Sequence, residues 1–254
     1  MNITVSAICD KGMVRNGNED AVLVNTDILR DAQANYNFNI EEKTKPFLIA
    51  VADGMGGHAA GEVASSYLVS SLSEKVLKLN QALEGDAIKQ AVGIWVGEIH
   101  EDLLSKGRSA PELNGMGSTL IGLLFYSQKI FSINVGDSRL YRYRNGILAK
   151  LSKDHSLREV SGDEEAPSNI ILNSFGGGKT IYFDFEELTS RIAVNDILLL
   201  CSDGLSSELN DDVIEHSIDK DLTGYDLVEM AKIKGGKDNI SVILIKIISD
   251  NEKQ

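Results

Sequence analysis

The chain of 254 residues has little cysteine, which could form disulfides, and little proline, which would interrupt helices and strands. It contains two cysteines, Cys9 and Cys201, and three prolines. Each cysteine stands beside apolar residues of strand character, so we interpret both as buried thiols in a reducing compartment rather than as a disulfide. The scarcity of proline and the lack of repeats or low-complexity sequence leave no candidate for a linker.

Long apolar runs are missing as well. No stretch approaches about 18 uninterrupted apolar residues, and residues 1–4 lack the basic and apolar blocks of a signal peptide. We therefore expect a soluble, cytoplasmic protein that does not enter a membrane. A hydrophobic content of 43% is enough for a substantial core, and we expect one domain over residues 1–248 with a short polar tail, 249–254.

Positive charge is in deficit, since 25 Lys and Arg face 38 Asp and Glu for a formal net charge of −13. Proteins bind nucleic acid through cationic side chains that displace counterions from the phosphates, so no nucleic-acid partner is expected. An acidic protein can still handle phosphate if divalent cations neutralise several of its carboxylates. The positions of the aspartates along the chain are therefore informative.

Apolar residues recur with two different periods. Spacings of three and four predict helices over 68–79 and 88–103, and one or two more are expected within 211–234. Alternation predicts strands at 131–135 and 139–144, the second closed by the hairpin turn Asn145-Gly146. Further strands are expected at 3–8, 21–25, 47–52, 118–126, 196–201 and 240–248. Grouped strands with bunched helices favour an α+β fold with antiparallel sheets.

Five aspartates occupy comparable positions where predicted strands meet loops: Asp20, Asp53, Asp137, Asp203 and Asp238. One Asp-Gly pair alone is a common turn, but five such positions together predict that the side chains converge. Glycine beside a ligand lets the backbone come close, and its carbonyl can itself bind metal. Carboxylates without a matching set of histidines or cysteines select hard cations, so Mg²⁺ or Mn²⁺ is expected rather than zinc.

Seven short motifs follow one another along the chain. They are Arg15-Asn16-Gly17-Asn18-Glu19-Asp20, Asp53-Gly54-Met55-Gly56-Gly57-His58, Gly117-Ser118-Thr119, Gly136-Asp137-Ser138-Arg139, Asp154-His155-Ser156, Ser202-Asp203-Gly204-Leu205 and Gly236-Lys237-Asp238-Asn239-Ile240-Ser241. None is specific alone, but their order across nearly the whole chain resembles the metal-dependent protein phosphatases of type 2C, particularly the short bacterial members. The resemblance implies a sandwich of two antiparallel β-sheets flanked by helices, in four αββα layers.

The resemblance also implies a set of metal ligands: Asp20, Asp53, Gly54, Asp137, Asp203 and Asp238. Asp53 would bridge two ions, with the carbonyl of Gly54 beside it. Asp203 and Asp238 would complete the shell of one ion, and Asp20 would support the other. Asp137 is similar to the aspartate that holds a weaker third ion in bacterial members.

The activity implied by the resemblance is hydrolysis of phosphoserine and phosphothreonine in proteins. Two cations that share a carboxylate would activate water for in-line attack on phosphorus. Arg15 resembles the arginine that grips the substrate phosphate, so the expected catalytic set is Arg15, Asp53, Asp203 and Asp238. The expected partners are phosphorylated proteins and a serine/threonine kinase that the enzyme opposes, and the chain is expected to be a monomer.

Two features depart from the family pattern. Animal relatives have a histidine directly after the Asp-Gly pair, where this chain has Met55. His58 is predicted to cap or pack the loop, which leaves the acid that protonates the leaving group open between His58 and metal-bound water. The flap between His155 and Phe175 is shorter and more acidic than usual, so the peptide preference is open as well.

Other interpretations use some of the same residues. Residues 54–59 fit the dinucleotide fingerprint Gly-x-Gly-x-x-Ala, with Glu74 as the ribose acceptor, although the βαβ alternation is lacking. A catalytically silent relative would bind phosphoproteins or a regulator without hydrolysis. Arg139, Arg142 and Arg144 alternate along one strand, and we interpret them as solvated charges at a sheet edge rather than a phosphopeptide groove.

Overall fold

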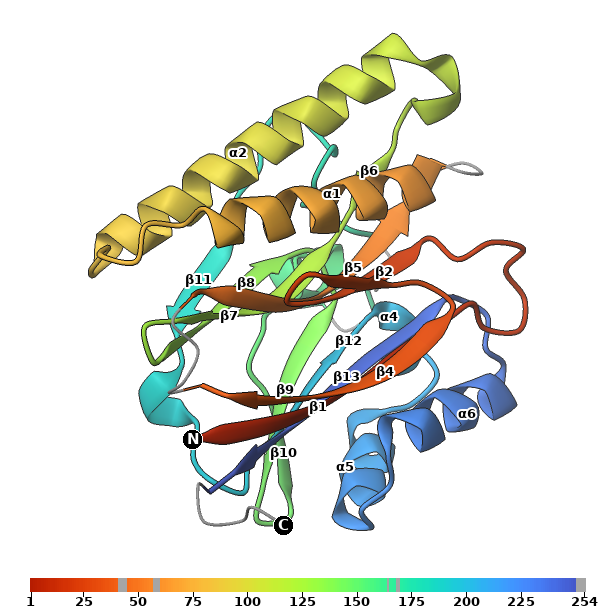
Figure 1. The fold of residues 1–254 in the computed structure, drawn as a ribbon. Helices are drawn as coiled ribbons and strands as arrows, with labels where there is room; N and C mark the ends of the chain where they lie inside the picture. The colour runs from red at the N-terminus through yellow and green to blue at the C-terminus, as the bar shows by residue number, and fades with distance from the viewer. Residues whose placement is uncertain (41–44, 57–59, 164, 168–169, 250–254) are drawn as a thin grey trace.

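The computed structural model describes residues 1–40, 45–56, 60–163, 165–167 and 170–249. Two antiparallel β-sheets stack face to face, and helices cover both outer faces, so the molecule has four layers (Figure 1). This arrangement confirms the predicted α+β sandwich. Of the predicted polar tail, only Ser249 belongs to the described residues.

The first sheet has six strands in the order β10-β9-β12-β13-β1-β4. Their bounds are β1 (Asn2–Asp10), β4 (Ala32–Asn39), β9 (Arg139–Arg144), β10 (Ile147–Lys150), β12 (Ile197–Cys201) and β13 (Ile240–Ile248). The first and last strands of the chain are neighbours, and Asp10 at the end of β1 lies opposite Ile240 at the start of β13. The loop that leaves β1 and the loop that enters β13 therefore meet at one edge of the sandwich.

The second sheet has seven strands, with β11-β8-β7-β5-β2-β3 in order and the short β6 paired to β5. The bounds are β2 (Asp20–Val24), β3 (Asp27–Leu29), β5 (Phe47–Met55), β6 (Gly117–Ser118), β7 (Leu120–Tyr126), β8 (Lys129–Val135) and β11 (Asp184–Glu187). Each strand pairing within the described residues is antiparallel. A dinucleotide-binding βαβ unit requires parallel strands, so the fingerprint interpretation of residues 54–59 is wrong.

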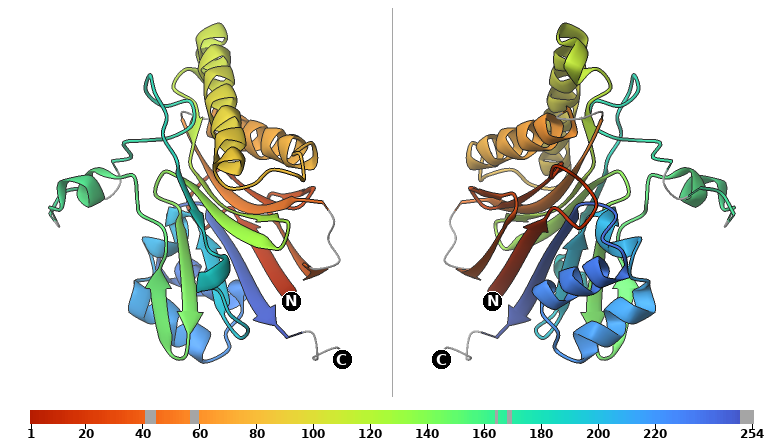
Figure 2. Two further views of the ribbon diagram at one scale, coloured as in Figure 1. Left: turned by 90° about the vertical axis from the view of Figure 1, so that its left-hand side faces the viewer. Right: turned by 90° about the vertical axis from the view of Figure 1, so that its right-hand side faces the viewer.

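Helices α1 (Ala60–Leu77) and α2 (Asp86–Ser109) cover the second sheet, as Figure 1 shows. The first sheet is covered by α4 (Asp203–Ser206), α5 (Asp211–Asp219) and α6 (Gly224–Lys234). The short α3 (Leu157–Ser161) stands away from the sandwich in both views of Figure 2. Single 3-10 turns occur at Pro111–Leu113 and Thr189–Arg191. None of the helices in the described part of the chain combines the length and apolarity that a membrane span needs.

Three apolar clusters fill the spaces between the four layers. The predicted helix periodicity is confirmed in the cluster between the second sheet and helices α1 and α2. Leu68 and Leu72 of α1 and Val92 and Ile99 of α2 are all buried there. The two cysteines are also buried and free, as predicted. Burial raises the pKa of Cys9 and of Cys201 to about 12, so both thiols are protonated and unreactive at neutral pH.

Local sequence predicted some strands better than others. Asn145 and Gly146 both have positive φ, 50° and 82°, which confirms the hairpin turn between β9 and β10. Strand β4 was not predicted, because its asparagines and glutamine have low strand propensity. It forms through pairing with β1. Tertiary pairing therefore overrides the local preference of this segment.

The interpretation of the three arginines as solvated edge charges is wrong. Strand β9 lies between β10 and β12, so it is not an edge strand. Arg139 pairs with Asp154 at 2.7 Å, and Arg144 pairs at 2.6 Å with Asp196, whose side chain is fully buried. Arg142 donates to the backbone carbonyl of residue 191 at 2.9 Å. All three guanidinium groups are held by protein acceptors.

Candidate metal and phosphate site

The five predicted aspartates come from five segments that approach one another at one end of the sandwich. Asp20 begins β2 and lies directly opposite Asp53 of β5. Asp203 follows β12 as the first residue of α4, and Asp238 stands just before the neighbouring strand β13. Asp137 follows β8. The strand ends therefore supply all five side chains, as the sequence predicted.

The charges of these aspartates reach one another. Burial and the charges of Asp20, Asp203, Asp137 and Asp238 raise the pKa of Asp53 well above its ordinary value. Burial also raises the pKa of Asp20 and the pKa of Asp137 to about 7 each, and in both cases the charge of Asp203 adds to the rise. Buried carboxylates in one field are unfavourable unless protons or cations neutralise them. Binding of positive charge among these carboxylates is therefore strongly favoured.

Two oxygen atoms of the cluster are also left without a hydrogen bond. Asp20 Oδ1 and Asp137 Oδ1 are buried with no partner among the described atoms. Buried polar atoms are normally paired, so such an oxygen points to an interaction with something other than protein. The donor set consists of carboxylates, which suit Mg²⁺ or Mn²⁺. The residues fit the divalent cations that the sequence predicted.

The carboxylates are nevertheless engaged by protein groups as they lie. Arg15 Nη2 donates to Asp238 Oδ2 at 2.6 Å, and Ser202 Oγ donates to Asp20 Oδ2 at 2.8 Å. Within the described residues, no three His, Cys, Asp or Glu side chains are arranged so that they could hold an ion without adjustment. A cation at this site would compete with Arg15 for Asp238.

Gly54, the predicted carbonyl ligand, has a steric reason to be glycine. A Cβ atom at this position would lie 2.2 Å from the carbonyl oxygen of Gly61 and 2.4 Å from that of Glu19. The Gly54 amide donates to the same Glu19 carbonyl at 3.1 Å. The backbone beside Asp53 is therefore packed against the segment that leads into Asp20, while metal binding by the Gly54 carbonyl stays a prediction.

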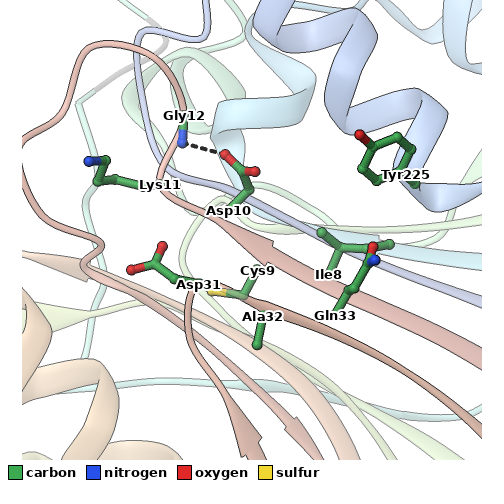
Figure 3. Close-up of a pocket in the computed structure, with 9 residues that line it drawn as sticks. All are labelled: Ile8, Cys9, Asp10, Lys11, Gly12, Asp31, Ala32, Gln33 and Tyr225. Carbon is green, nitrogen blue, oxygen red and sulfur yellow. Dashed lines mark hydrogen bonds between the residues drawn. The ribbon is translucent and has the colours of Figure 1, made fainter.

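Arg15 lies in the loop between β1 and β2, and its side chain is 51% exposed. The loop begins with a turn in which Gly12 N donates to Asp10 Oδ1 at 2.7 Å, as Figure 3 shows. Met13 N then donates to the carbonyl of Gly236 at 2.8 Å. A pocket of about 380 Å³ lies against the base of this loop and is lined by Lys11 and Gly12, but by none of the predicted site residues (Figure 3).

Replacement of Gly12 by alanine is expected to destabilise the protein, because Gly12 has φ of +75° and a Cβ would lie 2.1 Å from the Asp238 carbonyl oxygen. Backbone strain of this kind costs roughly 1–3 kcal/mol, which lowers Tm by about 2–12 °C in a domain of this size. Thermal denaturation measures the change. Gly17→Ala is the matched control in the same loop, because nothing lies within 4 Å of its Cβ position. Equal losses for the two variants would contradict the steric account.

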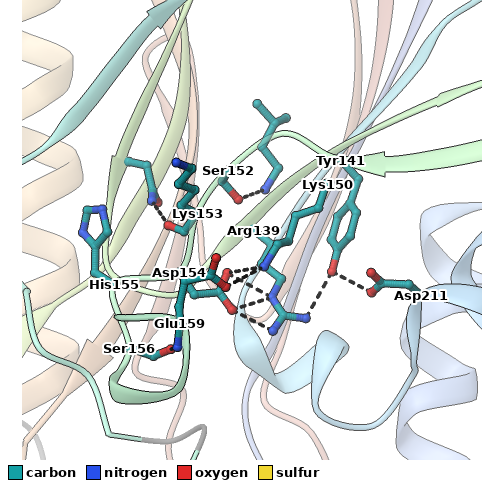
Figure 4. Close-up of polar contacts among 12 residues, drawn as sticks. Arg139, Tyr141, Lys150, Ser152, Lys153, Asp154, His155, Ser156, Glu159 and Asp211 are labelled. Atoms are coloured by element: carbon teal, nitrogen blue, oxygen red, sulfur yellow. Dashed lines mark hydrogen bonds and ion pairs between the residues drawn. The ribbon is translucent and has the colours of Figure 1, made fainter. Parts of the chain in front are cut away.

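A second pocket, of about 440 Å³, opens beside the carboxylates Asp137 and Asp203. A network of polar contacts lines it (Figure 4). Arg139 donates to both oxygens of Asp154 and to Tyr141 Oη, and Tyr141 Oη donates to Asp211 at 2.9 Å. The pocket lies next to the cluster, and its wall combines residues from several segments of the chain.

Several polar residues that hold the aspartates were not singled out from the sequence. Thr119 N donates to the carbonyl of Asp53 at 2.9 Å, and Thr119 Oγ1 accepts from Asp53 N at 3.2 Å. His155 Nδ1 accepts from the amide of Gly136 at 3.1 Å, which fixes the residue before Asp137. The sequence signal for Thr119 and His155 was that each belongs to one of the seven motifs, although neither motif contains one of the five aspartates. The predicted role of His58 lies outside the described residues.

Sequence comparison finds phosphatases over almost the whole chain. The family model described as Protein phosphatase 2C matches residues 25–225. The serine/threonine phosphatase stp of Listeria innocua is 31% identical over 252 residues, which is 93% of this chain and 93% of that protein. The serine/threonine protein phosphatase PstP of Mycobacterium tuberculosis is 30% identical over 96% of this chain and 45% of that longer protein.

Solved structures agree with the sequence comparison. The serine/threonine phosphatase of S. agalactiae superposes with a TM-score of 0.82 at 27% identity, over 96% of this chain and 99% of that chain. The catalytic domain of the serine/threonine protein phosphatase PstP, solved in complex with two manganese ions, superposes with a TM-score of 0.74 at 27% identity. The match covers 98% of this chain and 100% of that one.

Proposed function

Because the chain belongs to the protein phosphatase 2C family, we propose that Asp20, Asp53, Asp203 and Asp238 hold two divalent cations and that Arg15 binds the substrate phosphate. The protein is a metal-dependent protein serine/threonine phosphatase that uses Mg²⁺ or Mn²⁺. The observation that supports the residue assignment best is the field of four other aspartates at Asp53. We also assign the Gly54 carbonyl to the two-ion centre, beside Asp53, and Asp137 to a third ion.

Divalent cations bound by these aspartates would supply a nucleophilic water near neutral pH. The remaining work falls to the protein. The aspartates would hold the cations at the edge of the sandwich, and the backbone around Gly54 and Thr119 keeps Asp53 in place. We propose that the neighbouring 440 Å³ pocket, which Asp137 and Asp203 line, receives part of the phosphorylated substrate. Positioning and charge neutralisation account for most of the catalysis in such a site.

Arg15 is suited to the phosphate because a guanidinium has five donors in a planar fork. In the structure only Nη2 donates to Asp238, at 2.6 Å, so the remaining donors face solvent or substrate. The half-exposed side chain lies at the rim of the carboxylate cluster. Arg15 would hold a phosphate at this rim and offset part of its charge.

The substrates are phosphorylated proteins, and we propose that a serine/threonine kinase produces them. The test of the function is hydrolysis of an aryl phosphate and of a phosphothreonine peptide with and without Mn²⁺. The parent should turn over both substrates only with the metal, and Asp203→Ala should turn over neither. Binding of the phosphopeptide without hydrolysis by the parent would instead support the catalytically silent alternative.

Arg15→Ala is expected to raise KM for the aryl phosphate by roughly tenfold to a hundredfold, since charged hydrogen bonds contribute about 1.5–3 kcal/mol. Affinity for Mn²⁺ should stay equal or increase, because the variant frees Asp238 from its 2.6 Å contact with Arg15. Steady-state kinetics and calorimetry measure the two quantities. Weaker metal binding by Arg15→Ala would refute the proposed competition for Asp238.

A further inference from the structure

Asn239 is almost fully buried, and its side-chain amide joins three backbone positions of another part of the chain. Asn239 Oδ1 accepts from the amide of Glu19 at 2.8 Å. Asn239 Nδ2 donates to the carbonyl of Lys11 at 2.8 Å and to the carbonyl of Gly17 at 2.9 Å. Both amide hydrogens and the amide oxygen are therefore occupied.

These partners are the two ends of one loop. Lys11 stands where the chain leaves β1, and Gly17 and Glu19 stand where it enters β2, with Arg15 between them. One side chain thus closes the loop across its base. The loop has little apolar anchoring of its own, since Met13 is 65% exposed and Val14 is 63% exposed.

The backbone of Asn239 is equally fixed to the carboxylate cluster. Its amide donates to Asp238 Oδ1 at 2.9 Å, so the residue holds the aspartate that pairs with Arg15. Its carbonyl oxygen lies so close to Gly204 that a Cβ there would be 1.9 Å away. Asn239 therefore connects the Arg15 loop to the segments of Asp203 and Asp238 at the same time.

We propose that Asn239 is a positioning residue for the phosphatase reaction: its amide clamps the Arg15 loop at a fixed place relative to the carboxylates, and phosphate affinity depends on that clamp. The inference rests on the proposed role of Arg15. It adds a residue that touches neither phosphate nor cation and acts through the place where Arg15 is held. Without the amide, the turn at Gly12, the contact of Met13 with Gly236 and the bond from Asn18 Nδ2 to Cys9 Sγ still hold the loop, but the direct connection between Lys11 and Gly17 is lost.

The test uses binding of inorganic phosphate to the full chain with saturating Mg²⁺, measured by calorimetry. Asn239→Ala should weaken phosphate binding by about tenfold, the effect expected from loss of ordered donors at a charged ligand. The matched control is Tyr126→Phe. Tyr126 is also buried, and its hydroxyl holds a different loop, between α1 and α2, by accepting from Leu83 N at 2.7 Å and donating to the carbonyl of Asn80 at 2.8 Å. The control should lose similar thermal stability and keep phosphate affinity within about twofold.

A double-mutant cycle separates positioning from a general loss of structure. In an Arg15→Ala background, Asn239→Ala should change phosphate affinity by less than about twofold, because the group it positions is gone. Equal effects in both backgrounds, or no effect in the parent background, would overturn the inference. If Asn239→Ala does not fold, Asn239→Ser, which retains a polar group, carries the same cycle. If neither folds, the residue is needed for folding itself and the positioning role is wrong.

The same measurements separate failure of the role of Asn239 from failure of the proposed phosphatase function. A parent protein that neither binds phosphate nor hydrolyses an aryl phosphate would contradict the proposed function. A parent that does both, with binding weakened in Arg15→Ala but not in Asn239→Ala, would contradict only the role of Asn239.

Discussion

Asp53→Asn is expected to lower kcat for metal-dependent phosphatase turnover by about a thousandfold or more. Catalytic metal ions contribute several kilocalories per mole of transition-state stabilisation, and roughly 1.36 kcal/mol corresponds to a factor of ten. Asparagine keeps the shape of the side chain but removes the charge on which the fields of Asp20, Asp137, Asp203 and Asp238 act. Initial rates on an aryl phosphate across a Mn²⁺ titration measure the loss.

Although it lowers kcat, the same substitution should increase the stability of the metal-free protein. Burial and neighbouring carboxylates make a negative charge at Asp53 unfavourable, so its removal relieves repulsion. Asp53→Asn should therefore unfold at a higher temperature than the parent in the presence of a chelator. Asp212→Asn, at an exposed position in the first turn of α5, is the control and should retain activity. An Asp53 variant that is both active and less stable would contradict the metal assignment.

Stability of the metal-free protein is expected to depend on pH through Asp20 and Asp137. Their ordinary pKa is 3.8, and burial raises it to about 7 in the folded protein. Between those two values the folded chain keeps protons that the unfolded chain has released, so the contribution of these groups to stability falls as pH rises from about 4 to about 7. Above pH 7 the contribution should be flat.

Thermal denaturation of the parent and of an Asp20→Asn/Asp137→Asn variant isolates this contribution from the other titrating groups. With a chelator present, the variant should gain stability relative to the parent as pH rises from 4.5 to 7.5. Addition of Mn²⁺ at about 100 times its Kd should then stabilise the parent by roughly 2.7 kcal/mol per ion, or about 5–10 °C, and the variant much less. If Mn²⁺ does not change the Tm of the parent at pH 7.5, the aspartates do not form a cation site.

The shared position of Asp238 links the two kinds of ligand in this protein. Its Oδ2 accepts from Arg15, and the same carboxylate is one of the proposed metal ligands. A cation that binds Asp238 would therefore displace Arg15, the residue proposed to bind phosphate, from its present contact. Metal affinity and phosphate affinity should be measured together in any variant of this site.

The sequence was informative wherever local pattern and chemistry agree. Helical periodicity placed α1 and α2, and Asn145-Gly146 placed the hairpin of β9 and β10, because these features depend on residues close in the chain. It also indicated five aspartates at strand ends and the hard cations that such a donor set prefers. Strand β4 was not predicted, because its asparagines have low strand propensity and the strand forms through pairing with β1.

What the sequence determined by itself is therefore the set of candidate residues: the five aspartates, the order of the motifs that carry them and, through the family resemblance, Arg15. Only the tertiary structure decided how these groups interact. Asp20 meets Asp53 through strand register, Arg15 reaches Asp238 across 223 positions of sequence, and Asn239 closes the Arg15 loop from the far end of the chain. Such contacts depend on the pairing of β1 with β13, and no local periodicity specifies a pairing between strands so distant in sequence.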